Sequence, residues 1–264
     1  MKKLLTLIII IIISSFAQAQ VYEVKVRFKH HTKYTSEYIE KVFSDIKNEE
    51  QRKWNIEQNE NPKPIDFLIY SSKNEQNSVE QEKINNDQNY QGEIKKSVVG
   101  LPLGVTYSDF RLNENYKEED VYGKKYIVKN PIEELVWEYS NETKEILGYK
   151  VYKATSDFKK YKVEAWYTKE IDFDFMPINV KPIEGFVLEM NLFVESEKVG
   201  RMDNIIRVEA IQPNVKKYKF KNPLKADKAS KLPIVSQQEI AKIYDEANKK
   251  RNEMYNNTQG IDKK

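Results

Sequence analysis

The stretch Ile146–Ile171, ILGYKVYKATSDFKKYKVEAWYTKEI, decides the fold class of this chain. Apolar and polar residues alternate in Ile146–Thr155 and again in Lys162–Ile171, which is typical of two half-buried β-strands. Only a short polar segment separates the two runs. The stretch therefore predicts neighbouring strands of an antiparallel sheet with one face on a core and the other towards water or a covering helix.

Further strands are predicted on both sides of this stretch. Towards the C-terminus, Gly185–Val194 and Ile205–Ile211 read as a hairpin whose polar turn contains Gly200. Five more strands are predicted towards the N-terminus, at Val21–Lys29, Ile65–Tyr70, Ser97–Leu103, Tyr122–Val128 and Glu134–Tyr139. The sequence thus predicts a mainly β fold with minor α, an antiparallel meander of about nine strands.

Two helices are predicted beside the sheet. Thr35 or Ser36 can cap the first, and apolar residues at 3–4 spacing carry it towards Trp54. Ser236 and Glu239 form a capping box that begins the second. We therefore expect one helix on the N-terminal side of the sheet and one at the C-terminus.

The first residues have the pattern of a cleavable signal peptide. A positive start is followed by the apolar run Leu4–Ile13 and by the small-x-small site Ala17–Ala19. The run is shorter than the ~20 residues that span a bilayer, although an uncleaved N-terminal anchor is the alternative. We expect cleavage after Ala19, export to the periplasm or cell envelope of a Gram-negative bacterium or secretion from it, and no transmembrane segment in the mature chain.

The remaining chain is predicted to be one β-rich domain, residues 20–235, followed by a C-terminal helix and a frayed tail, residues 236–264. Ser71–Lys96 consists almost wholly of Asn, Gln, Glu, Lys and Ser, so it can bury little apolar surface. We expect this segment to be a polar loop or insertion, either a solvated spacer or a functional lid.

Composition limits the chemistry. The chain contains no Cys, which excludes disulfides, thiolate nucleophiles and thiolate metal sites. Its formal net charge is +3, and this nearly balanced charge argues against nucleic acid as a partner. The supply of 3 Trp, 17 Tyr and 11 Phe is ample for a core that must hold the fold without disulfides.

Two short motifs are candidates for a catalytic or metal site. His30 and His31 are the only histidines, and adjacent residues of an extended chain point to opposite faces. Asp172 and Asp174 place two carboxylates on one strand face, as glycoside hydrolysis requires. Because the chain has 41 acidic residues, such a pair arises by chance, and we assign no catalytic residue, metal ligand or cofactor.

An aromatic cluster supplies the candidate ligand-binding residues, which are Trp137, Tyr149, Trp166 and Tyr167. They either fill the core or line a cavity for an apolar ligand. Alternation puts Trp166 on the face opposite Tyr167, with polar neighbours. We expect a helix such as the one from Ser36 to Trp54 to cover Trp166, and a concave ligand surface is the alternative.

Residues 132–190 resemble the GLPGLI family of exported proteins of Bacteroidetes. The family's residues occur here in order as Trp137, Thr143-Lys144, Ile146, Gly148-Tyr149, Lys153-Ala154 and Ala165-Trp166-Tyr167-Thr168. The naming motif appears in degenerate form as PIEGFVLE, Pro182–Glu189, where Gly185, Leu188 and Glu189 match. The resemblance implies an envelope location and a β-rich fold, and it implies no agreed biochemical role.

The sequence therefore favours an exported envelope protein that is a non-enzymatic binding, carrier or chaperone-like accessory protein. Its partner is unknown; an outer-membrane protein and an apolar ligand are the two considered. Two alternatives remain open. One is a carboxylate-dependent hydrolase, marked by converging buried carboxylates, and the other is a structural component of an outer-membrane complex, marked by a bare strand edge or an apolar patch.

Overall fold

The computed structural model describes residues 20–81, 105–216, 218–225 and 232–258. The predicted signal peptide, residues 1–19, and the predicted strand Ser97–Leu103 lie outside the described residues. Among the described helices, none combines the length and the apolarity that crossing a membrane requires.

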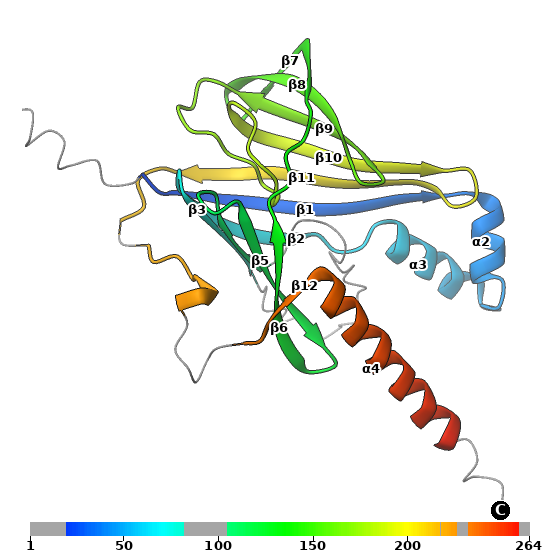
Figure 1. The fold of residues 1–264 in the computed structure, drawn as a ribbon. Coiled ribbons are helices and arrows are strands. Elements are labelled where there is room, and N and C mark those ends of the chain that lie inside the picture. The colour runs from blue at the N-terminus through cyan, green and yellow to red at the C-terminus, as the bar shows by residue number, and fades with distance from the viewer. Residues whose placement is uncertain (1–19, 82–104, 217, 226–231, 259–264) are drawn as a thin grey trace, which may run out of the picture.

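The described strands form one twelve-stranded sheet in the order β12-β6-β5-β4-β3-β2-β1-β11-β10-β9-β8-β7 (Figure 1). All neighbours pair antiparallel except β12 and β6, which are parallel. The strands are β1 (Tyr22–Tyr34), β2 (Ile65–Ser71), β3 (Glu75–Gln81), β4 (Thr106–Asp109), β5 (Glu114–Val121), β6 (Lys124–Pro131), β7 (Glu138–Ile146), β8 (Tyr149–Phe158), β9 (Tyr161–Thr168), β10 (Phe186–Ser196), β11 (Gly200–Gln212) and β12 (Ile234–Ser236). The predicted mainly β fold is confirmed, with more strands than the nine expected.

The first strand lies at the centre of the sheet. β1 pairs with β2 on one side and with β11 on the other, so segments from the two ends of the chain meet there. β6, near one end of the sheet, runs in a very different direction from β11, which lies beside the central strand β1 (Figure 1). This accumulated twist is the expected behaviour of a large open sheet.

The segment Ser71–Lys96, predicted as a polar loop, contains strand β3, and this correction has a physical reason. Gln76, Asn77 and Ser78 are buried there, and the side-chain amides of Gln76 and Asn77 donate to the carbonyl oxygens of Met176 and Thr106. Such side chains lack an apolar alternation, so the pattern did not predict a strand. Residues 82–104 lie outside the described residues.

The region predicted as one N-terminal helix contains two. Helix α2 (Ser36–Phe43) is capped by Thr35, whose hydroxyl oxygen accepts a hydrogen bond from the Tyr38 amide at 3.2 Å. Helix α3 (Glu49–Glu60) begins at a second cap, Asn48. The main tertiary contacts of α3 are with β1, and Figure 1 shows both helices beside the end of that strand.

The C-terminal helix α4 (Gln237–Thr258) begins at the predicted capping box. The Glu239 carboxylate accepts from the Ser236 amide at 2.7 Å, and the Ser236 hydroxyl accepts from the Glu239 amide at 3.2 Å. Ile240 packs against a small cluster on β5 and β6. Residues 259–264 of the predicted tail lie outside the described residues.

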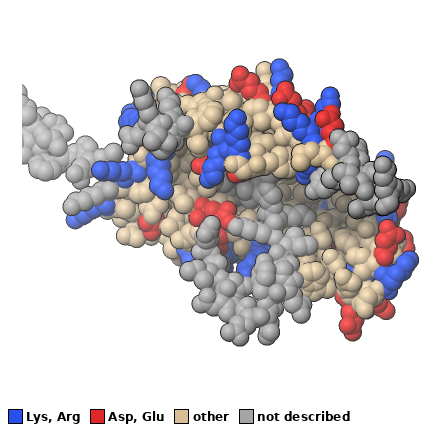
Figure 2. Space-filling view, turned by 90° about the horizontal axis from the view of Figure 1, so that it is seen from below, with Lys and Arg blue, Asp and Glu red and all other residues tan. Residues whose placement is uncertain are grey.

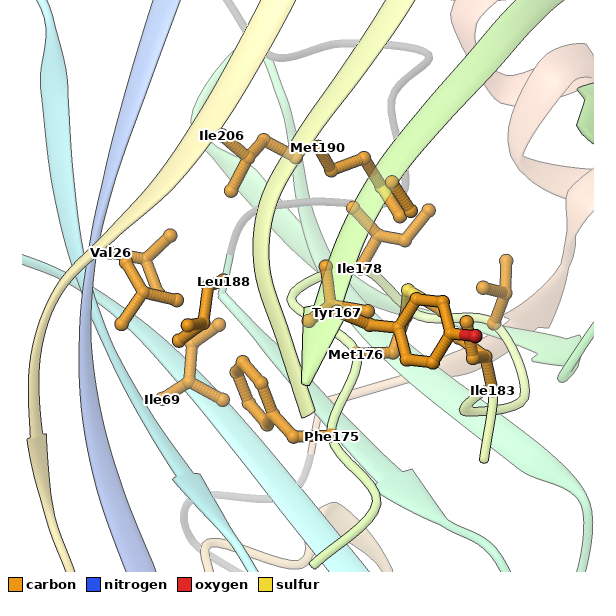
Figure 3. Close-up of a cluster of buried hydrophobic side chains, with 14 of the residues drawn as sticks. Val26, Ile69, Tyr167, Phe175, Met176, Ile178, Ile183, Leu188, Met190 and Ile206 are labelled. Carbon is orange, nitrogen blue, oxygen red and sulfur yellow. The ribbon is translucent and has the colours of Figure 1, made fainter. Parts of the chain in front are cut away.

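The main core lies on one face of β1, β2 and β8–β11, which we call the inner face. A segment between β9 and β10 covers it, and Figure 3 shows its Phe175, Met176 and Ile178 facing sheet residues such as Val26 and Leu188. The opposite face, which we call the outer face, carries half-exposed charged side chains. Because directly opposite residues of paired strands share a face, the register follows both faces across the sheet.

Candidate functional site

Two of the predicted site residues meet on the outer face. Trp166 of β9 lies directly opposite Glu189 of β10 in the strand register. The Lys144 ammonium is 2.7 Å from the Glu189 carboxylate and 4.2 Å from the centre of the Trp166 ring. Arg207 of β11 donates to the other Glu189 oxygen at 2.7 Å. Burial alone would raise the pKa of Glu189, but the bonds from Lys144 and Arg207 outweigh it and hold that pKa below its ordinary value.

The expected helix cover over Trp166 is wrong. The main contacts of α2 and α3 are with each other and with β1 rather than with β9. Lysine side chains lie over the ring instead, because Lys153 on β8 also places its ammonium 5.9 Å from the ring centre. Long basic side chains can shield an aromatic ring in this way while keeping their charge in water.

The other predicted residues lie in or against the core. Tyr167 and Leu188 are buried in the core cluster, and Trp137 and Tyr149 are half-buried against it. Gly185 has φ of +138°, and a Cβ there would lie 2.8 Å from the Thr168 carbonyl oxygen. The four aromatic residues therefore do not share one surface, since Trp166 and Tyr167 lie on opposite faces.

Three of the four candidate residues for catalysis or metal binding, His30, His31 and Asp174, form hydrogen bonds within the fold. His30 is buried, and its ring nitrogens form hydrogen bonds with Asn204 at 2.8 Å and Thr32 at 2.7 Å. His31 bonds to Asn61. Asp174 accepts the Gly185 amide at 2.7 Å. The bonds to Asn204, Asn61 and Gly185 join different parts of the chain, and the bond from His30 to Thr32 is local.

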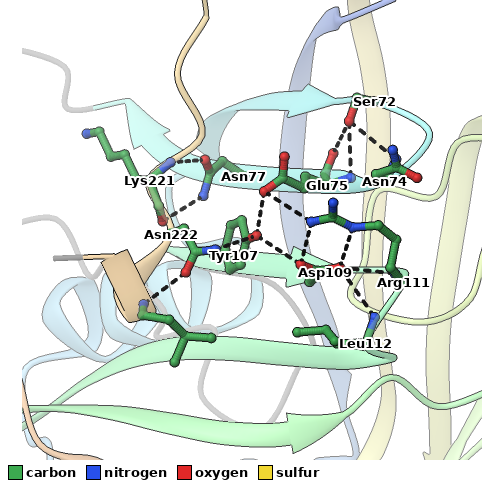
Figure 4. A network of polar contacts seen from close by, with 11 residues as sticks. Ser72, Asn74, Glu75, Asn77, Tyr107, Asp109, Arg111, Leu112, Lys221 and Asn222 are labelled. Carbon is green, nitrogen blue, oxygen red and sulfur yellow. Dashed lines mark hydrogen bonds and ion pairs between the residues drawn. The ribbon is translucent and has the colours of Figure 1, made fainter. Parts of the chain in front are cut away.

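A polar network on the outer face of β3 and β4 surrounds Tyr107 (Figure 4). The buried hydroxyl of Tyr107 donates to Glu75 at 2.6 Å and accepts from Asn222 at 2.9 Å. Burial, together with the nearby carboxylates of Glu75 and Asp109, raises the pKa of Tyr107 far above its ordinary value. Arg111 holds the pKa of Asp109 below its usual range through paired hydrogen bonds. The network fastens the segment before α4 to the sheet.

The inner face of the same strands carries a second set of polar side chains. Directly opposite one another on five neighbouring strands lie Ser71, Gln76, Ser108, Asn115 and Asn130, which we call the amide row. The Ser71 hydroxyl donates to Gln76 at 3.0 Å, and the Asn115 amide donates to Ser108 at 3.1 Å. The row therefore continues the inner face from the apolar core into a neutral polar surface.

The amide row ends in a cavity of about 590 Å³, which we call the amide groove. It lies where β5 and β6, the β8–β9 turn, the segment covering the core, and α4 come together. Its lining residues are Asn115, Lys117, Glu119, Val128, Asn130, Pro131, Glu133, Phe158, Lys159, Asn179, Gln237, Ile240, Ala241 and Tyr244. Elements far apart in the sequence thus build one concave surface of the size of a ligand pocket, ~300–1,000 Å³.

The charges that line the amide groove are balanced and paired. Lys117 lies 3.1 Å from Glu119, and Lys159 lies 3.3 Å from Glu133. The Tyr244 hydroxyl donates to Glu119 at 3.3 Å. In the face shown in Figure 2, basic and acidic residues are also interspersed rather than gathered in one patch. The groove therefore offers hydrogen-bonding groups without a net charge.

Two backbone positions with positive φ support the groove. Lys159, in the β8–β9 turn, has φ of +55°, and Tyr122, in the β5–β6 turn, has φ of +50°. The Tyr122 hydroxyl bonds to Asn248 of α4, and the Arg251 guanidinium lies 5.1 Å from its ring centre. Non-glycine residues rarely adopt this conformation. The turn thereby attaches α4 along the edge of the groove.

The amide groove could not be predicted from the sequence. Its signal was present as alternating neutral polar residues, Gln76 and Ser78 on one strand and Thr106 and Ser108 on the next. Such alternation indicates a strand with a buried polar face, but without the register nothing linked it to Asn130 or to α4.

The chain is similar to several known proteins. A family model described as "N-glycanase peptide, N-terminal domain" matches residues 46–222. Two solved structures of PNGF-II, in space groups C2 and P21, share 13% and 14% identity with TM-scores of 0.48 and 0.49. Both alignments cover 87% of this chain, which spans about a third of the PNGF-II chains, 32% and 34%.

A third solved structure is more distant. It is a DUF1329 family protein from Desulfovibrio piger ATCC 29098, with 8% identity and a TM-score of 0.29, and the alignment covers 79% of this chain and 91% of that one. No curated protein matches the sequence.

Proposed function

This chain belongs to the N-glycanase peptide N-terminal domain family, and from that premise we propose that it is a non-catalytic binding domain for N-linked glycoproteins in the cell envelope. The name of the family supplies the substrate class. The predicted signal peptide and the resemblance to exported GLPGLI proteins support the location, and both stay predictions of the sequence.

One observation carries the choice of binding over hydrolysis. The ionisable side chains that line the amide groove are held in pairs, Lys117 with Glu119 and Lys159 with Glu133, and Tyr244 bonds to the same Glu119. A general acid or base must instead face the substrate with a proton to give or take. The groove's remaining polar groups are amides, which bind by hydrogen bonds and do not titrate.

The test is an incubation of the purified chain with a high-mannose glycoprotein and with the same glycoprotein after its N-glycans have been removed. We expect the chain to retain the glycosylated form preferentially and to leave its mass unchanged. Release of glycan, seen as a mass loss, would show a catalytic domain. Equal retention of the two forms would show that the chain does not recognise the glycan.

A second candidate function, carriage of an apolar ligand, is favoured by a smaller cavity of about 390 Å³ on the outer face. Tyr116, Ile127 and Leu232 contribute apolar walls to it, and Asn77 and Asn222 contribute polar groups. Saturable enhancement of a fluorescent fatty-acid analogue, reduced by Ile127→Asp, would support carriage. The absence of such a signal would reject it.

A further inference from the structure

We infer that the amide groove is a binding site for a neutral saccharide that bears acetamido groups, recognised by the side-chain amides of Asn115, Asn130 and Asn179. This inference rests on the proposed function and deepens it. It names the ligand class and the residues, whereas the proposed function states only that glycosylated protein is bound.

The hydrogen-bonding capacity left open in the groove suits such a ligand. The Asn115 nitrogen already donates to Ser108 and to the Tyr107 carbonyl, which leaves its oxygen as an acceptor. The Asn179 oxygen accepts from Thr106 at 3.2 Å, which leaves its nitrogen as a donor. Within the described part of the chain, the side-chain amide of Asn130 has no hydrogen-bond partner. An acetamido group presents one N–H and one C=O, and sugar hydroxyls both donate and accept.

The arrangement of the amides is fixed by the sheet. Asn115 and Asn130 lie directly opposite each other on β5 and β6, so their Cβ atoms are ~4.5–5.5 Å apart. Asn179 approaches from the segment that covers the core. Two amides at this spacing can contact neighbouring polar groups of one sugar ring, and the third closes the groove from the facing side.

The balance of charge selects against ionic ligands. Two basic and two acidic residues line the groove, and they neutralise each other in the pairs described above. A phosphate or a carboxylate ligand would have to break one pair, which leaves a carboxylate facing the anion. A neutral ligand needs no such rearrangement.

Apolar surface in the groove suits the faces of a sugar ring and an acetamido methyl group. Phe158 closes the wall of the groove at the β8–β9 turn, but it is only 2% exposed, so the accessible aromatic surface comes from α4. The half-buried ring of Tyr244 lies on α4, with its hydroxyl engaged by Glu119. Rings held by their own packing and hydrogen bonds lose little conformational freedom when a ligand binds.

The experiment observes the side-chain amide signals of the ¹⁵N-labelled full chain by NMR during titration with N,N′-diacetylchitobiose, and separately with cellobiose, which lacks acetamido groups. We expect saturable shifts of the Asn115, Asn130 and Asn179 signals with the first sugar and at least tenfold weaker binding of the second. Unchanged signals with N,N′-diacetylchitobiose, or equal binding of the two sugars, would overturn the inference.

Asn130→Ala and Asn179→Ala are the groove variants, and Asn141→Ala on the exposed strand β7 is the matched control. Each groove variant should weaken binding of the sugar about tenfold, with the control unchanged and with thermal unfolding confirming that each variant is folded. Asn130→Thr provides a second variant at the same position in case Asn130→Ala does not fold. If the variants still bind glycoprotein as the parent does, the groove is wrong and the proposed function stands. If the parent retains no glycoprotein, the proposed function itself fails.

Discussion

Trp166 and Glu189 lie directly opposite each other on strands β9 and β10, and the ammonium of Lys144 contacts both side chains. The indole ring is therefore held in a charged row on the outer face. The side chains of Lys144 and Lys153 cover the ring, and α2 and α3 do not. This relationship fixes the energetic role of both residues.

Replacement of the half-exposed Trp166 should cost less than replacement of a core aromatic. We expect Trp166→Ala to lower the free energy of unfolding by about 1–2 kcal/mol, because the ring loses cation–π contacts and partial burial. Phe186→Ala, at a fully buried position in the core, is the comparison and should cost about 3–5 kcal/mol. Chemical denaturation measures both. Equal losses would show that Trp166 belongs to the core.

Glu189 should contribute to stability in a pH-dependent way. Lys144 and Arg207 lower its pKa in the folded chain, so its stabilisation is present above the ordinary value of 4.5 and is lost as pH falls through the lowered folded pKa. Glu189→Gln should therefore be less stable than the parent at neutral pH, and the difference should shrink in acid. Glu138→Gln, at an exposed position on β7, controls for the loss of one charge. A pH-independent difference would contradict the assignment.

Gly185 should tolerate a side chain far less well than another glycine with positive φ. A Cβ at Gly185 would approach the Thr168 oxygen to 2.8 Å, whereas a Cβ at Gly123 would face open space. We expect Gly185→Ala to cost about 2–4 kcal/mol and Gly123→Ala about 1 kcal/mol. Thermal unfolding of the pair decides this. Similar losses would mean that backbone conformation alone, not the close approach, explains Gly185.

The sequence predicted part of this account. Alternation found the apolar strands β8 to β11, because there one face is core and the other is charged. The capping box at Ser236 predicted the start of α4, because the geometry of a cap is local in sequence. The polar strands β3, β4 and β5 could not be predicted, because most of their buried residues carry amide or hydroxyl groups and so give no apolar alternation.

The site was harder to predict than the fold. The sequence pointed to Trp166 and Glu189 separately. Their position directly opposite each other depends on a register shift in β10. The amide groove depends on Asn115, Asn130 and Asn179 meeting from β5, β6 and a covering segment. No local pattern encodes such long-range proximity, which arises only when the sheet has formed and α4 has packed.

The predicted signal peptide implies a defined mature N-terminus. If a signal peptidase cuts after Ala19, the exported chain begins at Gln20, which can cyclise to pyroglutamate. Intact-mass measurement of the protein recovered from the envelope should give a mass without residues 1–19. A mass that includes them would show an uncleaved N-terminal anchor.

The affinity of the full chain for one intact N-linked glycoprotein shows whether the amide groove holds the glycan, when it is measured for the parent, for the double variant Asn130→Ala/Asn179→Ala and for the control Asn141→Ala. We expect the double variant to bind at least tenfold more weakly, while the parent and the control bind alike and all three unfold at similar temperatures. Parent-like binding by a folded double variant would contradict the claim that the amide groove holds the glycan.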